Sequence, residues 1–223
     1  MIDLTGLSKS FGSRVLWQDL TFTVEAGRML ALTGPSGSGK STLLNCLGLL
    51  DSPTTGTMRH HDQDLTKLSP RKARAYRRDT LGYLFQNYAL IDNATIADNL
   101  SVAVKPLRTG RGSRPAVAQA LEQVGLAGRG DDVVHRLSGG EQQRVALARL
   151  IVKQPALVLA DEPTGALDLD NTRMVIATLR ALADSGCAVV IATHDPTVRD
   201  LCDSVLPVGT TTHPHAVKEI TPA

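Results

Sequence analysis

The sequence predicts an α/β fold that combines a mostly parallel sheet with an N-terminal antiparallel β subdomain and an inserted α-helical subdomain. Three observations support this prediction. Two short apolar stretches, residues 4–7 and 20–24, flank a turn near the start of the chain. From residue 157 onward, strand-like segments alternate with helical ones, an order typical of a parallel sheet covered by helices. Between these regions, residues 69–137 are mostly helical and indicate an insertion.

The same observations divide one domain, residues 1–223, into segments. We expect residues 1–68 and 138–209 to form the core and residues 69–137 to form the helical subdomain. Residues 210–223 are a short, polar, proline-containing tail that is expected to fray. The sequence shows no internal repeat, so we predict a single domain of this kind and not a tandem pair.

The composition is that of a globular protein with few specialised features. The chain has 223 residues, of which 42% are hydrophobic, and it includes 19 Gly and 11 Pro. A net charge of +2 argues against nucleic acid as a partner. The one dense basic patch, Arg71–Arg78, has five cations in eight positions. It reads as a solvated helix face, with a docking or lipid-headgroup surface as the alternative.

Membrane-spanning and secreted classes are disfavoured. The longest apolar run, residues 43–50, is interrupted by Asn45 and Gly48 and is too short to cross a bilayer. Residues 1–3 lack the charged and apolar regions of a signal peptide. Three cysteines lie among apolar neighbours without metal-ligand spacing, which favours buried free thiols in a reducing cytoplasm: Cys46, Cys187 and Cys202. We therefore expect a cytoplasmic chain that reaches a membrane only through a partner.

The first elements of the chain lead into a phosphate-binding loop. Residues 28–33 read as a buried strand, and the apolar residues after Lys40 follow helical spacing. Between them, glycines let backbone N–H groups turn toward phosphate oxygens beside a helix N-terminus, whose dipole favours anions. The alternative, a chance glycine-rich turn, does not explain the flanking strand and helix. The predicted binding residues are Gly34, Pro35, Ser36, Gly37, Ser38, Gly39, Lys40, Ser41 and Thr42.

Three side chains of this loop have separate expected roles. Lys40 can reach the β- and γ-phosphates as a mobile charge, and the Ser41 hydroxyl can ligate Mg²⁺. Thr42 adds an α-phosphate contact. A turn-rich stretch at 51–56 then precedes a strand near Thr57, and a strand-like segment at 81–85 follows inside the helical region.

An acidic pair follows the apolar strand predicted at residues 157–160. Asp161 and Glu162 would lie at the carboxyl edge of a parallel sheet, where ligands bind in open α/β folds. Asp161 would hold Mg²⁺ through water, and Glu162 would orient and polarise the attacking water by positioning and electrostatics. Two acids that merely end a strand are the structural alternative. Further elements are expected as a helix at 171–182, a strand at 187–192, a helix at 196–202 and a strand at 204–208.

A second anion cradle precedes the acidic pair. Residues 137–144 read LSGGEQQR, and a predicted helix runs from them to about Lys153. Ser138, Gly139 and Gly140 would present a hydroxyl and backbone N–H groups at the positive end of that helix. Alone, such a segment could be an ordinary helix cap. Since one nucleotide has no room for two glycine cradles from one chain, this segment reads as a second, separate anion site.

Together, the phosphate loop, LSGGEQQR and the acidic pair resemble the ATP-binding subunit of an ABC transporter over nearly the whole chain. The resemblance implies a P-loop NTPase core, with ATP and Mg²⁺ as ligands and ATP hydrolysis as the activity. It also implies an ATP-dependent homodimer, arranged head to tail, in which LSGGEQQR covers the γ-phosphate held by the opposing chain. Integral-membrane permease subunits are the further partners implied.

Single residues extend the resemblance. Gln86 matches the family glutamine that approaches Mg²⁺ and the water, and His194 matches the histidine that contacts the γ-phosphate. Phe11 matches the aromatic residue that stacks on adenine, with an ordinary core Phe as the alternative. Asp168 matches a nucleotide-side residue at the dimer seam, while Gly165 replaces the usual Ser and removes one hydroxyl there.

Details at residues 49–56, 77–91 and 163–168 are similar to the group that works in macrolide efflux, lipoprotein release, bacteriocin export or immunity, and division-site signalling. The resemblance therefore implies an ATPase on the cytoplasmic face of the membrane that powers export or mechanotransmission by a separate permease. One alternative is a regulatory adaptor that signals through a membrane protein without transport. A soluble ATPase of DNA repair or translation is the other, but the long coiled coil or second nucleotide domain of those proteins is missing.

Overall fold

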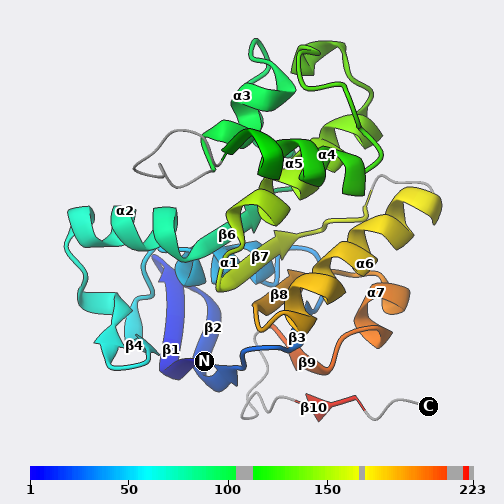
Figure 1. Ribbon diagram of the computed structural model, residues 1–223. Coiled ribbons are helices and arrows are strands. Elements are labelled where there is room, and N and C mark those ends of the chain that lie inside the picture. The colour runs from blue at the N-terminus through cyan, green and yellow to red at the C-terminus, as the bar shows by residue number, and fades with distance from the viewer. Residues whose placement is uncertain (104–112, 166–168, 210–217, 221–223) are drawn as a thin grey trace.

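The computed structural model describes residues 1–103, 113–165, 169–209 and 218–220, and it contains two sheets (Figure 1). The antiparallel sheet has the order β2-β1-β4-β5, and the six-stranded sheet has the order β10-β9-β3-β8-β7-β6. The first comprises β1 (Ile2–Phe11), β2 (Arg14–Val24), β4 (Thr55–His60) and β5 (Gln63–Asp64). The second comprises β3 (Met29–Thr33), β6 (Leu81–Leu84), β7 (Leu157–Asp161), β8 (Ala188–Ala192), β9 (Ser204–Pro207) and β10 (Lys218–Glu219).

The mostly parallel sheet predicted from the sequence is confirmed, since β9, β3, β8, β7 and β6 pair in parallel. One strand differs from the expectation. Lys218–Glu219 lie in the tail that was expected to fray, yet they pair antiparallel with β9. This two-residue pairing gives the tail backbone hydrogen bonds that composition alone does not reveal.

Helices cover both faces of the six-stranded sheet. They are α1 (Lys40–Leu47), α2 (Pro70–Asp79), α3 (Ile96–Ser101), α4 (Ser113–Gln123), α5 (Gly139–Lys153), α6 (Leu169–Asp184) and α7 (Pro196–Asp200). Two short 3₁₀ turns lie at 65–67 and 134–136. In Figure 1, α3 and α4 lie with the first turns of α5 above the sheets, while α6 and α7 flank the six-stranded sheet. Among the described residues, no helix is both long and apolar enough to cross a bilayer.

The core consists of two apolar clusters, one on each face of the six-stranded sheet. Alternating strand residues point to opposite faces, so Val158 and Ala160 join the cluster under α5 and α6. Leu157 and Leu159 join the cluster beneath α1 and the antiparallel sheet. Burial on both faces explains the continuous apolar runs of β7 and β8 in the sequence.

The free cysteines follow the same pattern. Cys46, Cys187 and Cys202 are buried and unbridged, as expected. Each belongs to one of the two apolar clusters.

Candidate functional site

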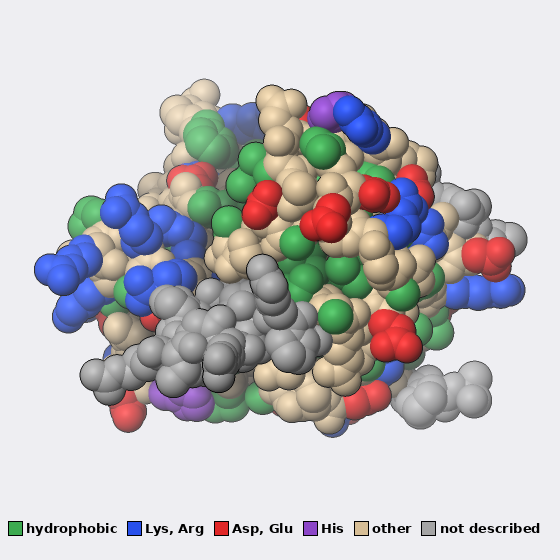
Figure 2. Space-filling model, turned by 45° about the horizontal axis from the view of Figure 1, so that its top comes forward, with side chains coloured by type: hydrophobic (Ala, Val, Ile, Leu, Met, Phe, Trp, Pro, Cys, Tyr) green, Lys and Arg blue, Asp and Glu red, His purple; other side chains and the backbone are tan. Residues whose placement is uncertain are grey.

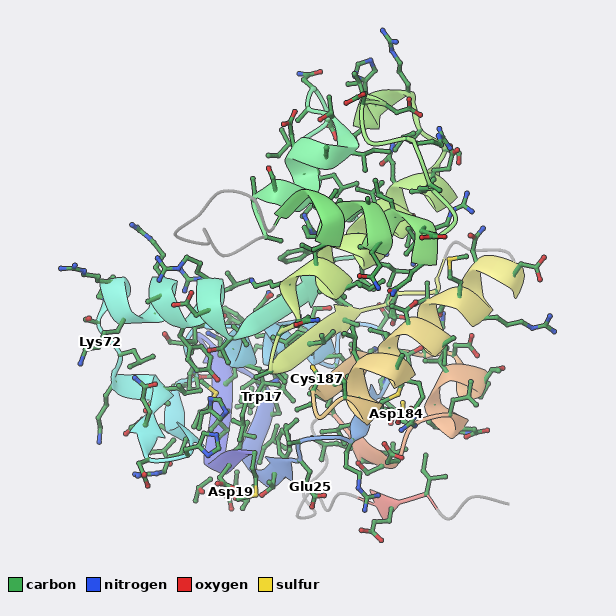
Figure 3. The ribbon with its side chains drawn as sticks, in the orientation of Figure 1. Trp17, Asp19, Glu25, Lys72, Asp184 and Cys187 are labelled. Carbon is green, nitrogen blue, oxygen red and sulfur yellow. The ribbon has the colours of Figure 1, made fainter. Side chains whose placement is uncertain are left out.

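The glycine loop between β3 and α1 has no room for side chains at two of its positions. Gly34 has a φ of 144°, and a Cβ there would collide with the carbonyl oxygen of Val208. Gly39 has a φ of 96° and lies against Trp17, whose ring would be 2.9 Å from an added Cβ. The Trp17 indole N–H also donates to the Gly39 carbonyl over 3.4 Å (Figure 3). Trp17 therefore packs against the loop, and the glycines leave the loop backbone accessible to a ligand.

Two polar groups of this loop fit a polyanion. The Lys40 ammonium donates to the carbonyls of Gly34 (2.9 Å) and Pro35 (3.3 Å), so its charge is held over the loop. Among the described residues no carboxylate pairs with it, although its side chain is buried. The Ser38 hydroxyl is buried without a hydrogen-bond partner in the described part of the chain. A bound triphosphate would supply oxygens to both groups.

The loop meets the first acidic residue directly. The Ser41 hydroxyl donates to Asp161 over 2.9 Å, which joins the start of α1 to the end of β7. Burial raises the pKa of the Asp161 carboxyl, and repulsion from Glu162 adds to the rise, while the bond from Ser41 opposes it. A hydroxyl oxygen beside a carboxylate is a donor set that suits Mg²⁺. A cation there would also hold Asp161 ionised.

The second acidic residue pairs with the predicted histidine. Asp161 and Ala192 are in register on neighbouring strands, so the residues that follow them emerge side by side. The Glu162 carboxylate lies 2.8 Å from His194 Nδ1. Its backbone has a φ of 46°, in the left-handed region, and its N–H donates to the Ala192 carbonyl over 2.9 Å. This uncommon conformation for a glutamate places the side chain on the ligand side of the sheet edge.

Most of the phosphate loop lines one cavity of about 880 Å³ together with Glu162 and His194, whereas Ser38 and Asp161 are not part of its lining. Phe11 lies on its wall at the end of β1, and its ring is 56% exposed, which does not fit an ordinary core Phe. Gln86 reaches the same cavity from the segment after β6. The lining residues are Phe11, Arg14, Leu16, Gly34, Pro35, Ser36, Gly37, Gly39, Lys40, Ser41, Thr42, Gln86, Glu162, Gly165 and His194.

The LSGGEQQR segment does not contribute to this cavity. Within the part of the chain that the structure describes, Ser138, Gly139 and Gly140 are absent from its lining. Ser138 instead caps α5: its hydroxyl and its N–H each contact the Glu141 carboxylate over 2.8 Å. Arg129 also bonds to Glu141, and together these contacts lower the pKa of the Glu141 carboxyl to about 2. Asp168, expected at the dimer seam, lies outside the described residues.

Four residues without an individual role predicted from the sequence support the site, and one of them, Gln143, lies within LSGGEQQR. Gln143, 3% exposed on α5, donates to the carbonyl of Pro163, the residue after Glu162. Arg149, also on α5, donates to the carbonyls of Tyr88 (2.8 Å) and Ala89 (2.7 Å), just after Gln86. The other two contact the phosphate loop: Arg14, which donates to Gly37, and Trp17.

A sequence signal was available for Gln143. It occupies the same helical face as Leu147 and Leu150, which are both buried. A polar residue within an apolar stripe is buried, and a buried amide requires hydrogen-bond partners.

Comparisons with known proteins agree with this geometry. A family model described as "ABC transporter" matches residues 17–165. The macrolide export ATP-binding/permease protein MacB of Salmonella typhimurium is 39% identical over 213 residues, covering 93% of this chain and 33% of that protein. MacB of Rhodopirellula baltica is 42% identical over 216 residues, covering 92% and 31%. The chain thus spans about one third of the length of the curated relatives it matches.

Solved structures give the same result. The dimeric structure of MJ0796, a bacterial ABC transporter cassette, has a TM-score of 0.88 at 29% identity and covers 99% of both chains. A dimeric post-hydrolysis state of MJ0796 bound to ADP and Pi has a TM-score of 0.87 at the same identity and coverage. The resemblance stated from the sequence motifs is confirmed by these matches. The chain therefore belongs to the ABC transporter family, as an ATP-binding cassette.

Proposed function

We propose that this chain binds ATP with Mg²⁺ and hydrolyses it as a head-to-tail homodimer that drives a membrane permease. The observation that carries the proposal is the cavity that unites the phosphate loop with Glu162 and His194 while excluding Ser138–Gly140. Relatives named for macrolide export and an MJ0796 structure that contains ADP and Pi support it.

The residues of the cavity divide the chemical work. The loop N–H groups and Lys40 bind the phosphates, and Phe11 offers a ring face to the adenine. Ser41 and Asp161 would hold Mg²⁺, with Gln86, which lines the same cavity, completing the site. When bound, Mg²⁺ neutralises charge that develops on the phosphate oxygens. Glu162 orients and polarises the water that attacks the γ-phosphate, and His194 holds the Glu162 carboxylate in place.

The dimer follows from the position of the second cradle. Ser138 and Gly139 are exposed at the N-terminus of α5, where they can meet an anion from outside the chain. In the proposed dimer they close the cavity of the partner chain, and Asp168 lies at the same seam. Hydrolysis at both sites removes the γ-phosphates that hold the two chains together.

The permease would dock in a groove of about 250 Å³ between α1, β6, α3 and α5. Leu50 and Val102 line it and are 51% and 66% exposed, so the groove offers apolar surface to a partner. Ala89 and Arg149 also line it, so the groove touches the segment that follows Gln86. Changes at Gln86 can thus reach the groove over a short path. This arrangement would place the chain on the cytoplasmic face of the membrane.

Replacement of Glu162 by Gln tests the proposal. Because the amide can still accept the His194 contact but polarises water weakly, ATP hydrolysis should fall by at least about 100-fold. ATP should still bind, and the variant should accumulate as an ATP-bound dimer in gel filtration. The control is Glu122→Gln on α4, where the side chain is exposed and remote from the cavity. Near-normal hydrolysis by Glu162→Gln would refute the assignment.

The division of the chain into a core at residues 1–68 and 138–209 with an insertion at 69–137 stays a prediction. The structure connects these two parts through β6, which lies within residues 69–137 and pairs with β7 of the core. An ATP-driven movement of the insertion would therefore have to pivot near β6.

A further inference from the structure

Helix α2 carries a surface of uncompensated positive charge. We define the α2 basic surface as Arg71, Lys72, Arg74 and Arg78, all of which are exposed. The helix contains five cations against one carboxylate, Asp79. Figure 2 shows a dense group of Lys and Arg side chains on the side of the molecule that α2 occupies in Figure 1.

Most of this charge has no partner within the described chain. Arg78 forms a two-point contact with Asp79, with both N–O distances at 2.9 Å. By contrast, no hydrogen bond or ion pair joins the charged side-chain group of Arg71, Lys72 or Arg74 to any described residue, and only the backbone N–H of Lys72 donates to the Ser69 cap. Three cations are therefore presented to solvent without local neutralisation.

The helix that presents them is anchored, so the surface has a fixed orientation. Ser69 caps the N-terminus and Pro70 occupies the first turn. Tyr76 is buried on the inward face, and its hydroxyl lies 2.9 Å from His60 Nδ1. Arg77 donates to the Leu49 carbonyl over 2.7 Å.

With Tyr76 and Arg77 turned inward, Arg71, Arg74 and Arg78 recur at helical spacing on the outward side. Figure 3 places Lys72 at the outer end of the helix, away from the core of the molecule.

The helix that carries the α2 basic surface also reaches the groove proposed for the permease, through its inward residue Arg77. Arg77 lines that groove together with the exposed apolar residues Leu50 and Val102. A permease bound in the groove would bring α2 close to the bilayer that the permease spans. This step rests on the proposed function, because it takes the orientation of the groove from it.

We infer that the α2 basic surface binds anionic phospholipid headgroups at the membrane surface. Guanidinium groups match phosphate oxygens in two-point geometry, and several cations on an outward helix face can meet several headgroups of one plane. The chain as a whole has a net charge of only +2, so the attraction is confined to this side and does not favour nucleic acid. Lipid binding would orient the groove toward the permease before docking.

Vesicle co-sedimentation tests this inference without ATP hydrolysis or a permease. The 223-residue chain should sediment with vesicles of phosphatidylglycerol and phosphatidylcholine in equal parts, and not with phosphatidylcholine alone. The triple variant Arg71→Glu, Lys72→Glu, Arg74→Glu should bind at least about 100-fold more weakly, since each lost cation contributes about fivefold and each added carboxylate is repelled by the anionic surface. Added salt should weaken wild-type binding, because the attraction is screened.

A matched control separates the α2 basic surface from net charge. Arg28, Arg173 and Arg199 lie outside α2, and each has a partly exposed side chain that pairs with a nearby carboxylate. Replacing all three by Glu changes the net charge of the chain by the same amount as the α2 triple variant. This control should bind vesicles nearly as wild type does. Both triple variants should bind ATP normally, which shows that they are folded.

Two results would overturn the inference. One is equal vesicle binding by the two triple variants. The other is wild-type protein that ignores anionic vesicles, which would assign the α2 basic surface to an acidic segment of a protein partner. Neither outcome depends on the Glu162→Gln experiment, so failure of the lipid inference and failure of the proposed function remain distinguishable.

Discussion

The buried Lys40 ammonium would be stabilised by a bound phosphate. Its ammonium contacts two backbone carbonyls, and its side chain is only 8% exposed. A buried cation without a carboxylate partner loses hydration that carbonyl dipoles replace only in part. The phosphates of ATP would replace that lost hydration with charge-assisted bonds. The residue is therefore prepared for its ligand before the ligand arrives.

Replacement of Lys40 by Ala should weaken ATP binding by at least about tenfold, because hydrogen bonds to charged groups contribute about 1.5–3 kcal/mol each. Trp17 provides the measurement: it is the single tryptophan of the chain and contacts Gly39, so its fluorescence should respond to ATP. Lys72→Ala, an exposed change on α2, should titrate as wild type does. If Lys40→Ala bound ATP with wild-type affinity, the loop would not be the phosphate site.

At this scale, sequence reasoning is most informative where the residues of a site are contiguous. The loop residues are contiguous, and their spacing carries the geometry of the cradle. The contact between Glu162 and His194 joins positions 32 residues apart, and only the family resemblance placed His194 near the site. Gln143 lies within LSGGEQQR and Pro163 directly follows the acidic pair, but nothing in the sequence indicated that these two residues, 20 positions apart, are in contact.

Among the elements, α5 has contacts at three functional places. Its N-terminus is Ser138 in LSGGEQQR, its second turn holds Pro163 through Gln143, and its fourth turn holds Tyr88 and Ala89 through Arg149. One helix thereby joins the exposed Ser138–Gly140 segment, the loop that carries Glu162, and the groove proposed for the permease. The side-chain amide oxygen of Gln143 is buried without a hydrogen-bond partner among the described residues. The Gln143 side chain is therefore held to the Pro163 loop only through its amide N–H group.

Replacement of Gln143 by Leu should lower kcat with little effect on KM for ATP. Leu fills a similar volume but cannot hold the Pro163 carbonyl, so the loop that bears Glu162 shifts while the phosphate loop stays intact. A displacement of about 1 Å at a reacting group can cost up to about 100-fold in rate. Steady-state kinetics gives both constants, and Gln123→Leu on α4 is the exposed control. A variant with unchanged kcat would show that Gln143 only fills space.

The element boundaries show where apolar periodicity fails as a guide. The first strand was expected at residues 4–7, but β1 extends from Ile2 to Phe11. Lys9 interrupts the apolar pattern, yet it is buried because it pairs with Asp51 over 2.7 Å and donates to the Ser52 carbonyl. Its partners are more than 40 residues away. A local sequence pattern cannot reveal that distant residues neutralise a buried lysine. Strands β7 and β8 were predictable because their buried residues are apolar and need no such partners.

For the molecule as a whole, the proposed head-to-tail dimer would make the cavity one half of a composite site. The cavity is lined by residues of the phosphate loop, Glu162 and His194, but not by Ser138–Gly140 of the same chain. A single chain should therefore bind ATP and hydrolyse it poorly. The specific rate of hydrolysis should rise with protein concentration until the dimer is saturated.

Mixing two inactive variants tests this arrangement directly. Lys40→Ala disables the loop, and Gly139→Asp places a negative charge where the partner's γ-phosphate would lie. Gly139 tolerates the change, since an added Cβ meets nothing nearer than the Tyr88 hydroxyl at 3.8 Å. In a mixed head-to-tail dimer, one composite site retains a normal loop and a normal cradle. The mixture should regain hydrolysis that neither variant shows alone, and persistent inactivity would contradict the shared site.

The short strand β10 has a further consequence for the behaviour of the chain in solution. An exposed sheet edge offers unpaired N–H and C=O groups to any neighbouring molecule, which makes long edge strands a route to aggregation. Lys218–Glu219 cover the outer side of β9 and present only two residues of their own at that edge. Loss of this pairing would expose β9 beside the core. Shortening the chain before residue 218 should therefore lower solubility without altering the cavity.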